Sequence, residues 1–147
     1  MAQKSPKPND GVPAVEVLNL QRKISVDLRH LQSFAERALR VCSKRAMQQL
    51  EEIVVVLISE DRMADLHRRF LNQRGPTDVI TFQHGEIFIS VPTAKRQARE
   101  FGTSTLAEIE LYIVHGLLHL SGFDDRTPAA TRRMRAAEAR VMKGAAV

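Results

Sequence analysis

The chain has 147 residues, of which 44% are hydrophobic and 27% charged, and a formal net charge of +5 at pH 7. Its length suits one domain with its own core, its composition is that of an ordinary globular protein, and its apolar runs are too short to span a membrane. The positive charge favours anionic partners, and RNA is one of them.

The first residues and the cysteine content indicate the compartment. Residues 1–13 are polar, contain three prolines and lack the apolar centre of a signal peptide. We therefore expect a disordered tail, followed by a single domain over residues 14–147. Cys42 is the only cysteine, which excludes an intramolecular disulfide and suits a reducing compartment. These features predict a cytoplasmic protein.

The N-terminal half predicts two strands and two helices. Residues 15–24 alternate loosely, as in an edge strand, and Ser25 is a candidate N-cap for the next helix. Apolar residues then recur at helical spacing up to Cys42, whose place on the apolar side favours a buried thiol over a nucleophile. The β-branched run over residues 53–58 predicts a strand buried on both faces. A short helix is predicted from the spacing of Met63, Leu66 and Phe70.

A hairpin is predicted next, followed by three helices. Gly75 and Pro76 form a turn, and strands over residues 79–82 and 86–91 surround Gly85. Pro92 suits the first turn of a helix that ends near residue 102.

The two last helices are predicted over residues 105–120 and 128–142. Thr105 and Glu108 fit a capping box, and the helix that they open is apolar almost all round, as in a central helix. The elements together predict an α+β fold, a single compact domain in which a small mixed sheet of about four strands packs with about five helices. The central helix carries the residues described next.

Two histidines stand four residues apart in that helix, in the segment His115-Gly-Leu-Leu-His119-Leu-Ser-Gly122-Phe-Asp124-Asp125. Positions i and i+4 lie on one face of a helix, so one cation can contact both imidazoles. Gly122 lets the chain leave the helix and turn back, which can bring Asp125 to the same point. Two histidines and one aspartate with an open fourth position are the ligands of a catalytic zinc site.

We expect His115, His119 and Asp125 to hold one Zn²⁺, which would make a bound water more acidic. Asp125 is preferred as third ligand over Asp124.

Gly116 occupies the position at which H-E-x-x-H metalloproteases carry their general base. A glycine cannot act as a general base, so this position argues against ordinary peptide hydrolysis. A glycine inside a helix costs about 1 kcal/mol relative to alanine. Something, either a strand or a substrate backbone, is therefore expected to approach the helix closely there.

The segment from His115 to Asp125 resembles the signature H-G-x-L-H-L-x-G-[YF]-D-H of the YbeY-type endoribonucleases, bacterial metal-dependent enzymes of rRNA maturation. Residues 75–82, GPTDVITF, are similar to the P-T-[DN]-V-[LI]-[ST]-F segment of that family. Residues 85–90, GEIFIS, are similar to its G-D-I-x-I-S strand. Order and spacing match from about Val15 to the C-terminus, so the resemblance covers nearly the whole chain.

The resemblance implies a zinc-dependent endoribonuclease directed at single strands, in which the ion would also stabilise charge on a phosphate during phosphodiester cleavage. Asp124 matches the family's own aspartate and would orient a histidine without binding the ion itself. The enzyme would act at the 3′ end of precursor small-subunit rRNA and in ribosome quality control, in contact with the small ribosomal subunit. Two positions depart from the family: Asp125 replaces the third histidine, and Leu71 stands where the family has an arginine. Arg69 and Arg74 are close in sequence and could reach the same phosphate. Asp78 and Thr77 would either line the cleft or serve turn formation.

Positive charge is clustered, most densely in the last helix, where it indicates either an RNA surface or a solvated helix face. The clustered cations there are Arg132, Arg133, Arg135, Arg140 and Lys143. Two alternatives to the endoribonuclease stay open: another zinc hydrolase such as a peptidase, and a non-catalytic RNA- or ribosome-binding relative that kept the fold.

Overall fold

The computed structural model describes residues 13–42, 47, 49–73 and 77–147. Residues 1–12 of the tail predicted over residues 1–13, the turn at Gly75 and Pro76, and Arg74 lie outside the described residues. Four strands form one mixed sheet in the order β1-β2-β4-β3, in which β3 alone runs antiparallel to its neighbour. The strands are β1 (Ala14–Asn19), β2 (Glu52–Ile58), β3 (Val79–Phe82) and β4 (Glu86–Ser90).

Five helices accompany this sheet within the described residues: α1 (Leu28–Val41), α3 (Glu60–Leu71), α4 (Val91–Phe101), α5 (Thr105–Leu120) and α6 (Pro128–Ala145). None of these described helices has both the length and the apolarity needed to cross a bilayer. The predicted α+β class, with a mixed sheet and a central α5, is confirmed, as are the edge position of β1 and the β3–β4 hairpin.

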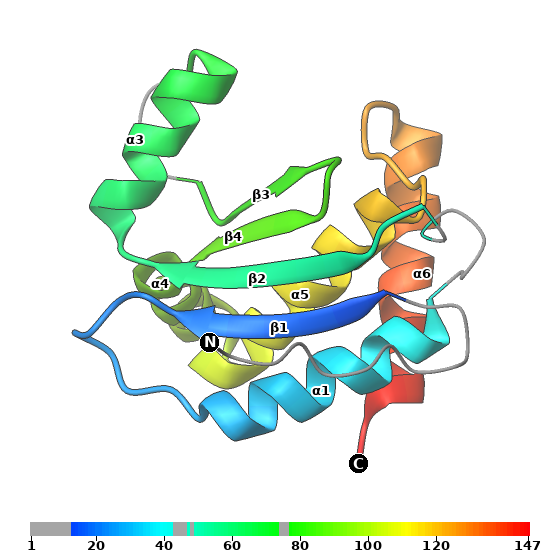
Figure 1. Ribbon diagram of the computed structural model, residues 1–147, viewed down its shortest axis with the longest axis horizontal. Coiled ribbons are helices and arrows are strands. Elements are labelled where there is room, and N and C mark those ends of the chain that lie inside the picture. Colours follow the sequence, from blue (N-terminus) through cyan, green and yellow to red (C-terminus); the bar gives the residue numbers. More distant parts are fainter. Residues whose placement is uncertain (1–12, 43–46, 48, 74–76) are drawn as a thin grey trace.

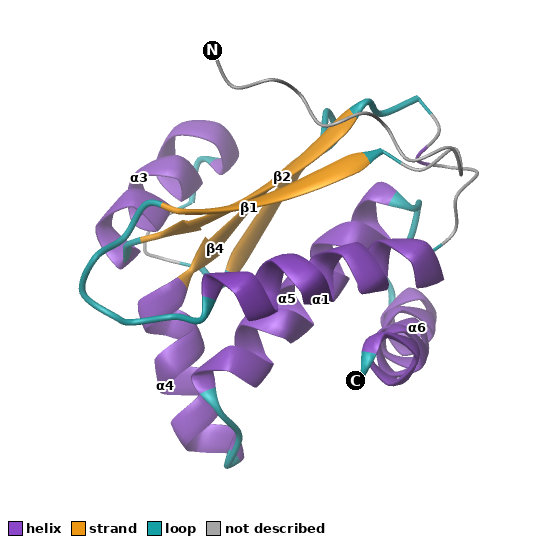
Figure 2. Ribbon diagram, turned by 60° about the horizontal axis from the view of Figure 1, so that its bottom comes forward, coloured by secondary structure: helices purple, strands orange, loops and turns teal. Residues whose placement is uncertain are grey.

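One face of the sheet is covered by four of the described helices and the other face by α3 (Figures 1 and 2). The larger core lies between one face and helices α1, α4, α5 and α6, and strand β2 contributes Ile53, Val55 and Leu57 to it. The alternate residues Val56 and Ile58 face the other side, where Met63 of α3 covers them. Strand β2 is thus buried from both sides along most of its length, as its β-branched run predicts.

Three element boundaries differ from the sequence-based expectation. Strand β1 ends at Asn19, because the Gln21 side chain bonds to both backbone groups of Ile24 and draws the chain into a local turn. Asp27, and not Ser25, caps α1 by accepting the backbone N–H of His30. The last helix continues beyond residue 142 to Ala145.

The N-cap of α5 is also shifted by one residue. Ser104, and not Thr105, accepts the N–H of Ala107 at 3.0 Å. Glu108 therefore does not complete the predicted capping box, and its carboxylate accepts the hydroxyl of Thr103 at 2.8 Å instead. Adjacent polar residues offer competing caps, which local sequence does not separate.

Helix α5 lies close against the sheet at Gly116. A Cβ atom at this position would stand 2.7 Å from Cγ2 and 2.8 Å from Cδ1 of the fully buried Ile87 of β4. The close approach expected at Gly116 is therefore made by a strand, through one of its side chains. This contact sets how deeply α5 sits over β4.

Replacing Gly116 with alanine should destabilise the protein by about 1–2 kcal/mol, because overpacking costs about 1–3 kcal/mol and outweighs the gain of up to about 1 kcal/mol in helix propensity. Chemical denaturation measures the change. The same substitution in an Ile87→Ala background should cost less, since the clashing methyl groups are gone. Gly144→Ala is the control: its Cβ would lie 3.1 Å from methyl groups of the partly exposed Val41, which has room to move. Equal costs in both backgrounds would contradict the assigned contact.

Candidate metal centre

The end of α5 positions the two histidines and returns the chain toward them. His115 and His119 lie one turn apart on the same side of the helix, which continues to Leu120. The N–H of Gly122 bonds to the carbonyl of His119, and the N–H of Phe123 bonds to that of Leu118. Gly122 has φ +101°, a conformation that L side chains rarely adopt, so glycine allows the reversal.

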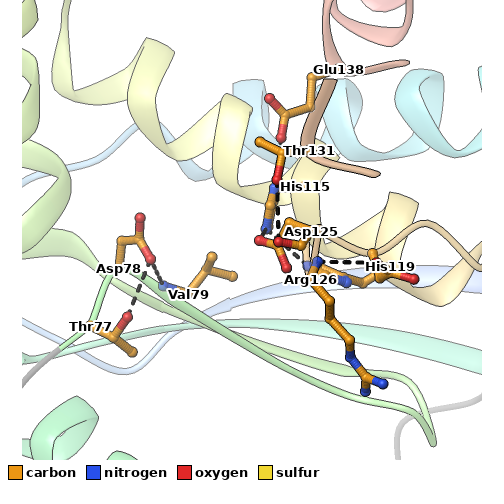
Figure 3. Close-up of polar contacts among 10 residues, drawn as sticks. Thr77, Asp78, Val79, His115, His119, Asp125, Arg126, Thr131 and Glu138 are labelled. Atoms are coloured by element: carbon orange, nitrogen blue, oxygen red, sulfur yellow. Dashed lines mark hydrogen bonds and ion pairs between the residues drawn. The ribbon is translucent and has the colours of Figure 1, made fainter. Parts of the chain in front are cut away.

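The reversal places a carboxylate beside the two imidazoles (Figure 3). The Nε2 atoms of His115 and His119 are 3.0 Å apart, and Asp125 Oδ2 lies 3.8 Å from His115 Nε2. One donor atom from each of the three residues falls within 4.8 Å of the others.

These separations fit one small divalent ion. Two ligands on a tetrahedral zinc lie roughly 3.3 Å apart, because zinc–nitrogen and zinc–oxygen bonds measure about 2.0–2.1 Å. The observed 3.0 and 3.8 Å bracket that value. The Asp125 side chain is 50% exposed, so the donor set opens to solvent on its side. The three predicted ligands could therefore hold such an ion with small side-chain adjustments.

A fourth residue, Glu138 of α6, belongs to the site and was not predicted from the sequence. Its Oε1 lies 2.6 Å from Nδ1 of His115, where the ring N–H donates to the carboxylate (Figure 3). This bond leaves Nε2 of His115 facing His119 and Asp125. The only sequence signal is that Glu138 is the single acidic residue of α6 and follows the buried Ala137.

The imidazole of His115 is held through an atom outside the donor set, because its Nδ1 contacts the Glu138 carboxylate. Ligand histidines commonly donate their second ring N–H to a carboxylate or a backbone carbonyl, which fixes tautomer and orientation. His115 therefore has the outer contact that is common among metal-binding histidines.

The electrostatics of the two histidines differ. Burial disfavours the protonated form of His115, but the hydrogen bond and charge of Glu138, with smaller contributions from Asp125 and Asp78, raise its pKa above the ordinary value. Burial lowers the pKa of His119, and the charge of the neighbouring His115 lowers it further. In the absence of a cation, a proton is therefore held on His115 in preference to His119.

Two other aspartates predicted to belong to the site, Asp124 and Asp78, form hydrogen bonds mainly within their own loops. Asp124 accepts the backbone N–H of Arg126 at 3.1 Å within its own loop, and Glu138 has the histidine contact that Asp124 was expected to make. Asp78 accepts the N–H of Val79 at 2.8 Å and the hydroxyl of Thr77 at 3.4 Å, which are turn contacts (Figure 3).

Asp78 nonetheless lies near enough for its charge to raise the pKa of His115. On α3, by contrast, Arg69 pairs with Asp65 at 3.2 Å, and the exposed Leu71 offers no charge to a phosphate.

Comparison with known proteins places this arrangement in a family. The model of the family described as "Endoribonuclease YbeY" matches residues 16–146. The endoribonuclease YbeY of Acidothermus cellulolyticus is 32% identical over 149 residues, which cover 87% of this chain and 88% of that protein. That of Saccharopolyspora erythraea is 37% identical over 110 residues, 62% of this chain and 60%, less than two thirds, of that protein.

A solved structure shows the same fold. The solution structure of TM1509 from Thermotoga maritima matches with a TM-score of 0.60 at 25% sequence identity, covering 88% of this chain and 89% of that one. With a family match that extends over nearly the whole chain, the protein belongs to the endoribonuclease YbeY family.

Proposed function

We propose that this protein is a zinc-dependent endoribonuclease that cleaves single-stranded RNA in the cytoplasm. Its substrate would be the 3′ end of precursor small-subunit rRNA, and it would act in contact with the small ribosomal subunit, including in ribosome quality control. The observation that supports this most is the convergence of His115, His119 and Asp125 in a chain of the endoribonuclease YbeY family. Gly116, in place of a glutamate base, disfavours a peptidase.

The ion would be held by Nε2 of His115, Nε2 of His119 and a carboxylate oxygen of Asp125. When bound, a divalent ion supplies a more acidic water and stabilises charge on a phosphate. The protein's own residues set the geometry. Glu138 holds the ring of His115, and the hydroxyl of Thr131 donates to the backbone carbonyl of Asp125 at 3.2 Å, which anchors the loop to α6.

Asp125 changes the character of the site relative to the histidine of the family pattern. A carboxylate brings a negative charge where an imidazole is neutral, so a bound ion becomes a weaker Lewis acid. A non-catalytic RNA- or ribosome-binding relative is therefore the second candidate, and the exposed Leu71 at the family's arginine position favours it.

Metal analysis of the untagged, purified protein tests the ligand assignment. We expect about one zinc per chain in the wild type and in Asp124→Ala, and loss of zinc in Asp125→Ala. Asp125→His should retain zinc, because it supplies the donor found in the family pattern. An Asp125→Ala protein that keeps its zinc would show that another group is the third ligand. A wild type that takes up no zinc, even when it is added, would exclude the metalloenzyme.

Glu138 should act on the ion through His115. Glu138→Ala is expected to weaken zinc affinity about 10- to 100-fold, as is typical for loss of a carboxylate behind a ligand histidine. Glu138→Gln keeps a hydrogen-bond acceptor without the charge, so its zinc affinity should lie between those of the wild type and Glu138→Ala. Chelator competition measures the affinity, and ¹⁵N shifts of His115 report its tautomer. Glu100→Gln, an exposed carboxylate on α4, is the control. Unchanged affinity and tautomer in Glu138→Ala would refute the role.

Cleavage of a single-stranded precursor rRNA fragment tests the activity. The zinc-loaded wild type should cut it, the double variant His115→Ala/His119→Ala should not, and Asp125→His should cut faster than the wild type. Cleavage of casein but not RNA would instead indicate a peptidase. No cleavage by the wild type or by Asp125→His, with ribosomal co-sedimentation that survives the double histidine variant, would favour the non-catalytic relative.

A further inference from the structure

The positive charge of this protein is concentrated on one helix. Helix α6 contains five cationic residues and one acidic residue, Glu138, so it accounts for four of the five net positive charges of the chain. Glu138 points inward to His115 and is half-buried. The solvent side of α6 therefore presents cations without an acidic residue of the same helix among them. They are Arg132, Arg133, Arg135, Arg140 and Lys143.

These five side chains are exposed and unneutralised. Within the part of the chain that the structure describes, none of them takes part in an ion pair. By contrast, three arginines of α3 and α4 are paired: Arg68 and Arg69 share Asp65, and Arg96 is paired with Glu60. An array of cations without counter-charges costs stability through mutual repulsion unless an anion binds to it.

Helical spacing arranges the cations as a track. The inner face of α6 is set by buried residues from Ala130 to Ala145. Arg132 and Arg135 lie one turn apart on the opposite side, and Lys143 continues that side toward the C-terminus. Arg133 and Arg140 form a second row on one flank, about 10 Å apart along the axis. A chain of phosphates could contact several of these groups in succession.

The track begins at the candidate metal centre. Arg133 lines a shallow hollow together with Gly122 and Asp124, in the loop that delivers Asp125. Arg126, in the same loop, extends its side chain away from the three ligands (Figure 3). On its opposite flank, α6 is hydrogen-bonded to the site: Thr131 contacts the backbone of Asp125, and Glu138 contacts His115. A strand lying on α6 would therefore lead into the donor set.

We propose that the outer face of α6 binds the phosphate backbone of single-stranded RNA and guides it to the His115–His119–Asp125 site. This inference rests on the proposed function, since it names the surface that holds the same substrate. It also assigns to Arg132, Arg133 and Arg135 the phosphate contacts that Leu71 does not make. Contacts of this kind carry no sequence information, so α6 would set affinity and direction but not the choice of cleavage site.

The test is equilibrium binding of a short fluorescein-labelled single-stranded RNA by the full chain in EDTA, where metal-dependent cleavage does not occur. Binding is measured over a range of KCl concentrations for the wild type, Arg132→Gln/Arg135→Gln and Arg22→Gln/Lys23→Gln. The last variant removes the same charge from exposed residues of the loop between β1 and α1, at the opposite end of the molecule from α6 (Figures 1 and 2).

The α6 variant should bind more weakly, and its slope of log K against log salt should be shallower by about 1.4, since each contact with a single strand contributes about 0.7. The control should keep the wild-type slope. Equal changes in both variants would mean a general charge effect and would overturn the inference. The inference would also be overturned if the α6 variant kept its RNA binding but lost binding to an acidic protein.

The inference and the proposed function can fail separately. Zinc-dependent RNA cleavage with a wild-type salt slope in the α6 variant would keep the function and overturn the track. A shallower slope in the α6 variant, with no cleavage by the zinc-loaded wild type, would support the track on a protein that only binds RNA.

Discussion

The seating of α5 on β4 is the constraint on which the rest of the structure depends. Gly116 leaves room for the methyl groups of Ile87, and an added Cβ would lie 2.7 Å from one of them. The helix is buried on most of its surface, so its depth and its rotation are fixed together by packing. With Gly116 turned to the sheet, the neighbouring His115 is left at the border of the core, where its side chain keeps 23% of its exposure. The two histidines of α5 are thus placed by an apolar contact that they do not make themselves.

An imidazole at such a border needs a partner, and α6 provides it. Burial works against a protonated His115, but the Glu138 carboxylate at 2.6 Å, together with Asp125 and Asp78, raises its pKa. Burial and the charge of His115 lower the pKa of His119. Two Nε2 atoms 3.0 Å apart cannot both carry a proton without repulsion. Under the proposed function, a divalent cation would take the place of that proton and would be held by both nitrogens and the Asp125 carboxylate. The two histidines therefore differ in their affinity for a proton, with the pKa of His115 raised and that of His119 lowered.

The parts of the site that follow from local sequence were predictable, and those that depend on tertiary contacts were not. The spacing of His115, His119 and Asp125 is set by one helix and one glycine turn, so a pattern of eleven residues contains it. Glu138 stands 23 positions beyond His115 on another helix, and only the packing of α6 on α5 brings them together. The capping assignments failed for a different reason, because Ser104 and Thr105 offer the same chemistry in adjacent positions. The class of the fold was fixed by longer patterns, such as the β-branched run of β2, that no single side chain can alter.

Helix α6 carries negative charge on its inner side and positive charge on its outer side, and the two charges have different roles. Its one carboxylate faces inward, where it holds a histidine, while its cations face water. Moving the acid outward would remove the support of His115 and at the same time neutralise part of the basic face of α6. The arrangement also relates to the change at Asp125, which adds a negative charge where the family pattern has a neutral imidazole. Under the proposed function, a phosphate approaching that carboxylate would meet repulsion, which the cations of the first turns of α6 would offset. In that proposal the aspartate and the basic face of α6 act on the same anion with opposite signs.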